Sequence, residues 1–148
     1  MAKPEDGQHL CLDNQVCFSL YSAANALVRA YRPLLEELDL TYPQYLAMMV
    51  LWSDNGISVK LLGEKLRLDS GTLTPLLKRL EGKGLLHRGR SEQDERVRVI
   101  ELTEAGQALK LGASQVPEKM FCLLGLDVAK LQSLKQLCDE VNQALDQR

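Results

Sequence analysis

The chain of 148 residues lacks the features of a membrane or exported protein. No stretch approaches the roughly 18 consecutive apolar residues that a membrane-spanning helix requires. The first residues, 1–7, are polar and do not form the apolar run of a signal peptide. We therefore expect a cytoplasmic protein that does not contact a membrane, and its 45% of apolar residues is an ordinary share for a globular core.

The cysteine spacing that marks a metal site is also missing. The four cysteines lie at positions 11, 17, 122 and 138, and no two of them have the CxxC spacing of a zinc site. We expect neither a metal nor another cofactor. A structural disulfide is unfavourable in a reducing cytosol, so each cysteine is expected by default to be a free thiol that fills the core.

Basic residues are slightly fewer than acidic ones, 18 against 20, but they are concentrated in the middle of the chain. The net charge of the whole chain is −2. Residues 1–59 carry a net charge of −4, residues 60–98 carry +4, and residues 99–148 carry −2. A basic segment between two acidic ones indicates that the middle third contacts an anionic partner such as nucleic acid.

The two ends of the chain predict helices. Apolar residues recur at helical spacing over residues 13–35, where Asp13 is expected to cap the start. Residues 104–148 are also predicted to be helical, with interruptions or bends at Pro117 and Gly125. The last part has apolar residues at alternating three- and four-residue steps, which suits packing against another helix. These residues are Leu131, Leu134, Cys138, Val141 and Leu145.

Residues 41–103 predict a lobe built around a helix-turn-helix. Thr41 followed three residues later by Gln44 is a capping box, and it opens a strongly apolar helix. Two short helices joined by a tight turn follow over residues 58–83. The second of them is rich in hydroxyl and basic side chains, which is typical of the DNA-binding helix of this motif.

A charged hairpin follows the second helix directly. Two short strands, Leu85–Arg90 and Val97–Leu102, enclose a polar loop, so residues 85–102 are the expected wing. Arg96 lies in this loop, and a narrow minor groove attracts an inserted arginine. Asp94 either holds that guanidinium in place or forms an ordinary surface ion pair, and the spacing does not separate these alternatives.

The start of the second helix carries the side chains expected to contact DNA. A helix N-terminus in the major groove presents short donors and acceptors to base edges. Gly71 would allow close approach of the backbone, and the positive helix end favours a nearby phosphate. The alternative is that Ser70 and Thr72 only cap the helix and that Lys78 is solvated. The candidate residues are Ser70, Gly71, Thr72, Thr74, Lys78 and Arg79.

Several longer stretches resemble one known family. DER at 94–96 followed by LTEAG at 102–106 is similar to the wing of the MarR family of bacterial regulators and its exit into the next helix. LDNQVCF at 12–18, TYPQY at 41–45 and LDSGTLTPLL at 68–77 resemble the organic-hydroperoxide-sensing branch of that family. The resemblance covers the chain from Asp13 to about Gly106.

The resemblance implies the fold and the assembly. It implies a mostly α-helical chain with a small β wing, a winged helix-turn-helix that forms a single unit over residues 1–148. Residues 41–103 would be the DNA-binding lobe. The terminal helices, 13–35 and 104–148, would form the interface of a homodimer. The implied function is repression from a double-stranded DNA operator, relieved when an organic hydroperoxide oxidises a cysteine near the N-terminus.

The resemblance also implies roles for individual residues. By position, Cys17 is the sensing thiol, and Tyr31 and Tyr42 are the two tyrosines that support it. Arg96 is the wing arginine, with Asp94 beside it. In the members that use a second, resolving cysteine late in the chain, the corresponding residue is Cys122. Packing of Cys122 into the core remains the alternative.

Helix geometry constrains the implied sensor. The thiolate is the form that attacks a peroxide, and Cys17 would lie in the first turns of its helix, where the dipole favours negative charge. Tyr31 follows 14 residues later, so the two residues would lie roughly 20 Å apart along one straight helix. If Tyr31 supports Cys17, it must come from an antiparallel partner chain.

Two other functions remain as alternatives. A regulator of this family that answers to a phenolic or other small-molecule ligand would keep the DNA contacts and make Cys17 incidental. A thiol peroxidase is disfavoured, because turnover needs a thiol system for recycling and the basic lobe would have no purpose. We expect a regulator and not an enzyme.

Overall fold

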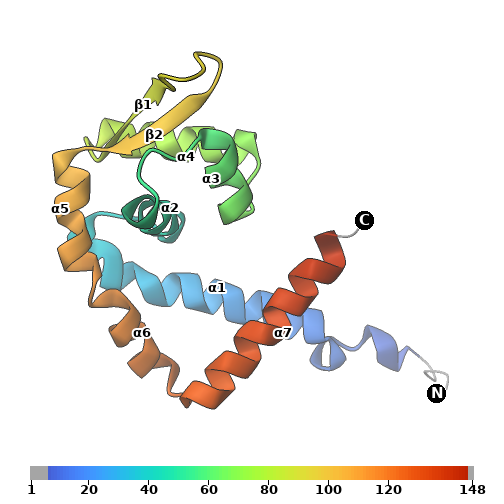
Figure 1. Ribbon diagram of the computed structural model, residues 1–148. Coiled ribbons are helices and arrows are strands. Elements are labelled where there is room, and N and C mark those ends of the chain that lie inside the picture. Colours follow the sequence, from blue (N-terminus) through green and yellow to red (C-terminus); the bar gives the residue numbers. More distant parts are fainter. Residues whose placement is uncertain (1–6, 147–148) are drawn as a thin grey trace. The chain divides into compact units, whose positions relative to one another are not determined.

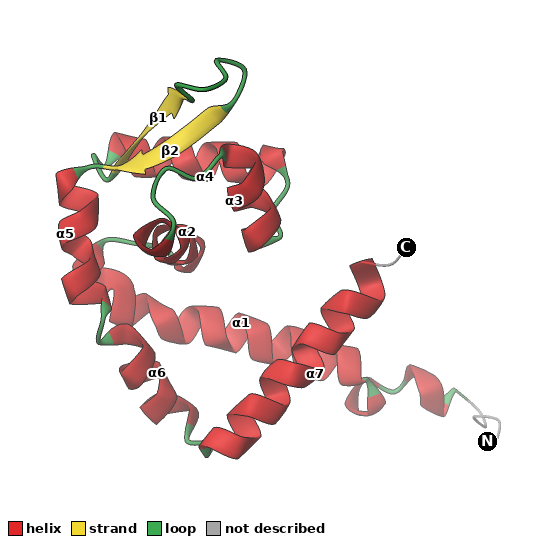
Figure 2. Ribbon diagram, in the orientation of Figure 1, coloured by secondary structure: helices red, strands yellow, loops and turns green. Residues whose placement is uncertain are grey.

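Most of the described chain is helical (Figure 1, Figure 2). The computed structural model describes residues 7–146, apart from the side chain of Gln8. The α-helices are α1 (Val16–Leu35), α2 (Tyr42–Ser53), α3 (Val59–Leu66), α4 (Ser70–Gly82), α5 (Glu104–Ala113), α6 (Val116–Leu124) and α7 (Val128–Asp146). The strands are β1 (Leu86–Arg90) and β2 (Arg98–Leu102), and the short 3-10 helices are η1 (Gln8–Leu10), η2 (Leu12–Asn14) and η3 (Glu36–Leu38). A mostly helical chain with one small sheet confirms the predicted fold class.

The chain divides into two compact units. The first unit runs to Ser114 and contains α1 to α5 together with the sheet, and the second begins at Gln115 and contains α6 and α7. In the described part of the chain, no helix is both long enough and apolar enough to cross a membrane.

The core of the first unit lies beneath α4. This helix contacts α2, α3 and β1, and its buried side chains recur at helical spacing. Burying one leucine completely contributes about 1.5–3 kcal/mol, so this apolar stripe is a main source of the lobe's stability. The buried residues of the stripe are Leu73, Leu76, Leu77 and Leu80.

Side-chain caps start the helices of the lobe, and the predicted capping box at Thr41 is confirmed. Thr41 and Gln44 form both hydrogen bonds of the capping box, with Gln44 N donating to Thr41 Oγ1 at 3.4 Å and Thr41 N donating to Gln44 Oε1 at 3.1 Å. Ser58 and Thr103 cap α3 and α5 with one hydrogen bond each: Leu61 N donates to Ser58 Oγ and Gly106 N donates to Thr103 Oγ1, both at 3.1 Å. The prediction for Asp13 is wrong: α1 begins after Gln15, and no side chain caps it, because Asp13 lies within η2.

Backbone pairing ties the wing to the helix-turn-helix. The two strands are antiparallel, with Leu86 opposite Leu102 and Arg90 opposite Arg98. The loop between α2 and α3 joins the outer side of β2: Gly56 N donates to the carbonyl of Ile100, and Ile100 N donates to the carbonyl of Ile57, each at 2.9 Å. The wing is therefore anchored to the segment that leads into α3.

Two long helices carry exposed apolar side chains. On α1 these include Val16, Phe18, Leu20, Tyr21 and Val28. No residue of α7 is buried, and its exposed apolar residues are Val128, Leu134, Leu137, Val141 and Leu145. Gly125, with φ of 64°, ends α6 in the left-handed conformation before α7 begins. A single chain thus leaves apolar helix faces in contact with water.

The start of α5 is packed against the base of the wing, and this contact yields a stability prediction. A Cβ added to Gly106 would lie 2.0 Å from the carbonyl oxygen of Leu85. The Gly106 carbonyl also accepts a hydrogen bond from Trp52 Nε1 at 2.9 Å, so the backbone cannot move away freely. We expect Gly106→Ala to lower the free energy of unfolding by about 3 kcal/mol or more, measured by urea denaturation.

Gly82→Ala is the matched control. No atom lies within 4 Å of the position that its Cβ would occupy, and the residue is helical, so the change should be neutral or stabilising by up to about 1 kcal/mol. Equal stability of the Gly106→Ala variant and the wild type would contradict the close packing of α5 on the wing.

Candidate functional site

The exposed face of α4 carries the residues predicted to contact DNA. Asp69 is the N-cap, and its Oδ1 accepts a hydrogen bond from Thr72 N at 2.8 Å. This hydrogen bond lowers the pKa of the Asp69 carboxyl below its ordinary value. The alternative that Ser70 and Thr72 are the capping residues is therefore wrong. All six candidate side-chain positions are exposed: Ser70, Gly71, Thr72, Thr74, Lys78 and Arg79.

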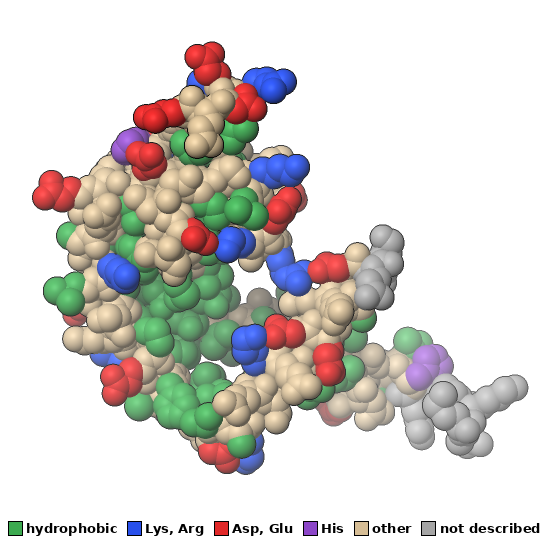
Figure 3. All heavy atoms as spheres, in the orientation of Figure 1, with side chains coloured by type: hydrophobic (Ala, Val, Ile, Leu, Met, Phe, Trp, Pro, Cys, Tyr) green, Lys and Arg blue, Asp and Glu red, His purple; other side chains and the backbone are tan. Residues whose placement is uncertain are grey.

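The wing turn holds an arginine in a defined position. Asp94 Oδ1 accepts hydrogen bonds from both the backbone N of Arg96, at 3.0 Å, and its Nε, at 3.2 Å. The backbone hydrogen bond is the main reason that the pKa of Asp94 lies below its ordinary value. The Arg96 side chain is 91% exposed, so Asp94 orients the guanidinium without covering it. Figure 3 shows basic and acidic side chains together at the distal end of the wing.

A second carboxylate fastens the base of the wing to α4. Glu81 Oε2 accepts a hydrogen bond from the backbone N of Arg88 at 2.9 Å, and Glu81 Oε1 pairs with its guanidinium at 3.2 Å. The hydrogen bond from the backbone of Arg88 is the main reason that the pKa of Glu81 lies below its ordinary value. The sequence did not predict this pair, because a separation of seven residues across a glycine turn matches no local helix or hairpin pattern.

Lys83 ties the end of α4 to the start of α2. Its ammonium donates to the carbonyl oxygen of Asp39 and, at 3.1 Å, to Gln44 Oε1. Gln44 is 4% exposed and also belongs to the capping box of α2. The buried amide oxygen therefore has two donors, and it links the end of α4 to the turn that precedes Tyr42.

Three of the four cysteines, Cys11, Cys17 and Cys122, are exposed in the single chain, and Cys138 is half-buried. The default expectation of core-filling thiols, including the alternative given for Cys122, is therefore wrong for the chain by itself. Cys17 is the second residue of α1, where the helix dipole favours a negative charge.

Three of the four tyrosines form a cluster in which burial raises the pKa of each hydroxyl. The rings of Tyr31 and Tyr42 are stacked, with centroids 4.4 Å apart, and Tyr45 lies 5.9 Å from Tyr31. Burial, followed by the neighbouring Tyr42 and Tyr45, raises the pKa of Tyr31 to about 12. Burial also raises the pKa of Tyr42. Tyr45 was not among the predicted site residues, although its place one turn after Tyr42 in an apolar helix indicates that the two side chains lie on the same side of α2.

One continuous helix separates Cys17 from these tyrosines. α1 runs unbroken from Val16 to Leu35, so Cys17 and Tyr31 lie about 21 Å apart along its axis. Tyr42 stacks on Tyr31 and is therefore also far from Cys17 of the same chain. The prediction that Cys17 and Tyr31 cannot meet within a subunit is confirmed. Cys122 belongs to the second unit, on α6.

The described residues contain no group of three or more His, Cys, Asp or Glu side chains arranged to bind a metal ion.

A helix-turn-helix followed directly by a two-stranded wing defines the winged-helix class of transcriptional regulators. The family described as “Transcriptional regulator SarA/Rot” matches residues 29–111. The organic hydroperoxide resistance transcriptional regulator of Bacillus subtilis is 50% identical over 129 residues, which cover 87% of this chain and 86% of that protein. The chain belongs to the MarR family of winged-helix regulators, in the branch that contains this Bacillus protein.

Solved structures of AbfR, from Staphylococcus epidermidis, are also similar. Reduced AbfR bound to DNA is 32% identical with a TM-score of 0.80, and the match covers 95% of this chain and 96% of that chain. The disulfide form of AbfR is 33% identical with a TM-score of 0.62, covering 95% and 93%. Since the family consists of transcriptional regulators, the expectation that this protein is a regulator and not an enzyme is confirmed.

The raised pKa of Tyr31 predicts a loss of stability in alkali. Between pH 10 and about 12, Tyr31 ionises in the unfolded chain but not in the folded one, so the unfolded chain binds fewer protons. The free energy of unfolding should therefore hold its full value below pH 10 and fall across this window. Urea denaturation at a series of pH values should show a smaller fall for Tyr31→Phe, which has no phenol at this position. An identical fall in both proteins would contradict the protected hydroxyl.

Proposed function

We propose that this protein is a homodimeric repressor that releases its double-stranded DNA operator when an organic hydroperoxide oxidises Cys17. The observation that carries the proposal is the exposed thiol of Cys17 at the N-terminus of α1. In a chain that is 50% identical to an organic hydroperoxide resistance regulator, this thiol is available both to a peroxide and to a second subunit.

The DNA-binding half of the proposal rests on α4 and the wing. The exposed hydroxyl side chains lie at the N-terminal end of α4, which would enter a major groove, and the exposed Lys78 and Arg79 follow further along the helix. A Cβ on Gly71 would meet only the Asp69 carboxylate, at an ordinary 3.4 Å, so the fold does not require glycine there. A close approach of the α4 backbone to DNA would explain why a glycine is present at position 71. Arg96, oriented by Asp94, would enter the adjacent minor groove.

The proposed dimer explains the exposed apolar faces of α1 and α7. Monomeric soluble proteins seldom leave contiguous apolar patches in water. A second copy of the chain that packs on residues 13–35 and 104–148 would cover both faces. Residues 41–103 would then remain as the free DNA-binding lobe. An antiparallel arrangement of two α1 helices would bring Tyr31 and Tyr42 of one subunit toward Cys17 of the other.

The proposed chemistry begins with the Cys17 thiolate. It attacks the peroxide O–O bond, forms Cys–SOH and releases the alkoxide, which takes up a proton to become an alcohol. The tyrosine hydroxyls, whose raised pKa values keep them protonated, are suited to donate hydrogen bonds to the thiolate. The Cys122 thiol then displaces water from the sulfenic acid and forms a disulfide, and we favour a bond between subunits.

Disulfide formation would be the switch. The two Cα atoms of a disulfide must come within about 7 Å of each other. If Cys17 and Cys122 begin further apart, forming the bond moves the helices that carry them. That movement would shift the two DNA-binding lobes away from the spacing of the operator half-sites.

The central test compares the release of DNA by the wild type with that by a Cys17→Ser variant. A gel-shift assay on the upstream region of the protein's own gene should show tight binding by the reduced wild type and release after addition of an organic hydroperoxide. Cys17→Ser should bind equally and stay bound, because serine is not oxidised. Cys11→Ser, another exposed cysteine, is the matched control and should release like the wild type. Release that persists in Cys17→Ser would favour a small-molecule ligand as the signal.

Non-reducing gels in the same experiment test the resolving cysteine. Hydroperoxide should produce a dimer-sized band in the wild type and in Cys138→Ser but not in Cys122→Ser. A band that persists in Cys122→Ser would remove this residue from the mechanism.

The proposed role of Arg96 makes a prediction about affinity. Arg96→Ala should weaken operator binding by roughly 1–3 kcal/mol, because the guanidinium would lose its place in the groove. Fluorescence anisotropy with a labelled operator gives the dissociation constants. Gln93→Ala changes a neutral side chain in the same turn and should leave them unchanged. An unaltered affinity for Arg96→Ala would mean that Arg96 is an ordinary solvated surface residue that does not contact the DNA.

A further inference from the structure

The face of the wing that covers the core continues outward as a row of arginines. Side chains alternate between the two faces of a strand, and directly opposite residues share a face. Leu86, Ile100 and Leu102 are buried, so their face points toward the helices. The same face then carries Arg88, and toward the tip Arg90 and Arg98, which are directly opposite each other.

The Arg90–Arg98 pair is a like-charged pair without a counter-charge. Arg88 is neutralised by Glu81, as described above. Within the described part of the chain, neither Arg90 nor Arg98 forms an ion pair, and Asp94 is engaged by Arg96. Directly opposite side chains on an antiparallel pair have Cβ atoms about 4.5–5.5 Å apart, and like charges there are destabilising. Such a pair becomes favourable when an anion lies between its members.

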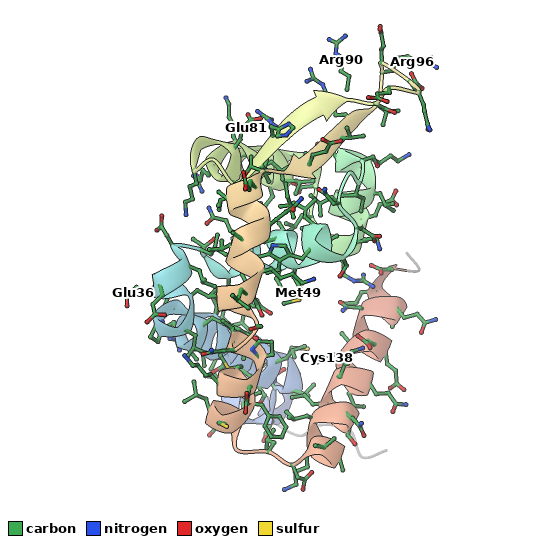
Figure 4. All side chains as sticks on the ribbon, turned by 60° about the vertical axis from the view of Figure 1, so that its left-hand side comes forward. Glu36, Met49, Glu81, Arg90, Arg96 and Cys138 are labelled. Carbon is green, nitrogen blue, oxygen red and sulfur yellow. The ribbon has the colours of Figure 1, made fainter. Side chains whose placement is uncertain are left out.

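Of this pair, Arg98 is open toward α4, whereas Arg90 lines a separate hollow together with Ser91, Glu92 and Gln93. Arg88 and Arg98 line a groove between the wing and α4, together with Val59, Thr74, Leu77 and Glu81. The Nε of Arg88 is buried there and has no hydrogen-bond partner. Figure 4 shows Arg90 and Arg96 projecting from the distal end of the wing, with Glu81 near its base. The groove therefore joins the predicted base-contacting helix to the cationic face of the wing.

The geometry of a winged helix on DNA identifies the anion. When α4 lies in a major groove and Arg96 in the adjacent minor groove, the sugar-phosphate backbone between the two grooves passes between α4 and the wing. We propose that Arg90 and Arg98 form a phosphate clamp that binds this stretch of the DNA backbone. The clamp rests on the proposed function and adds a contact to it. The clamp positions the wing and carries no base specificity, since phosphates are the same in every sequence.

The salt dependence of binding tests the clamp. Each phosphate contact contributes about 0.9 to the slope of log K against log salt concentration. Arg98→Gln removes one contact from each wing, so the slope for a dimer should become shallower by about 2. Operator and unrelated DNA should be weakened by the same factor, leaving their ratio unchanged.

The stability of the free protein provides an independent measurement. Arg98→Glu places a carboxylate directly opposite Arg90 and replaces repulsion by attraction. The clamp therefore predicts that this variant melts at a higher temperature than the wild type at low salt, while its DNA affinity falls further than that of Arg98→Gln. The higher melting temperature also shows that the loss of binding does not come from misfolding. A melting temperature that is unchanged or lower would overturn the repulsion on which the clamp depends.

The remaining outcomes separate the clamp from its alternatives. If the wild type binds its operator and Arg98→Gln has an unchanged salt slope, the clamp is overturned and the proposed function stands. If the wild type does not bind the operator, both are overturned. Inorganic phosphate at constant ionic strength is the probe for a free anion. Stabilisation of the wild type but not of Arg98→Gln by phosphate, without a change in the DNA slope, would assign the pair to a free anion and overturn the DNA clamp.

Discussion

The lobe depends on the backbone pairing around Ile100. This residue is fully buried, and its amide and carbonyl bond to the segment that leads from α2 into α3. The pairing makes the wing a continuation of the helix-turn-helix, because a two-stranded hairpin alone is only marginally stable in water. Glu81 adds a second attachment from α4 to Arg88. The exposed residues of α4 and the arginine of the wing turn, which are proposed to contact DNA, are thereby held on one connected support.

The length of α1 sets the corresponding constraint on the thiol chemistry. A helix of 20 residues keeps Cys17 at one end and the tyrosine cluster at the other. The hydroxyls of one chain therefore cannot support the thiol of that chain, and the proposed sensor needs two subunits. Lys83 connects the tyrosine end of this arrangement to α4 through the buried amide of Gln44.

Much of the lobe was predictable, because its signals are local. The caps at Thr41, Asp69 and Thr103 are side chains that bond to an amide three residues later, so each leaves a sequence pattern. Tertiary contacts leave no such pattern. The Glu81–Arg88 pair, the contact of Lys83 with Gln44 and the place of Tyr45 in the aromatic cluster needed the structure. The cap expected from Asp13 was wrong, because a 3-10 turn occupies that residue and α1 begins later.

The sequence by itself determined the order and type of the elements, the basic middle third and the family to which the chain belongs. Apolar periodicity and helix capping depend on residues that are only a few positions apart. Both can therefore be recognised in the sequence. Only the tertiary structure decided which arginines on the two strands of the wing form an ion pair and which do not. Arg88 and Arg98 are both basic residues of one hairpin, but only the packing of α4 gives Arg88 a carboxylate and leaves Arg98 opposite another arginine.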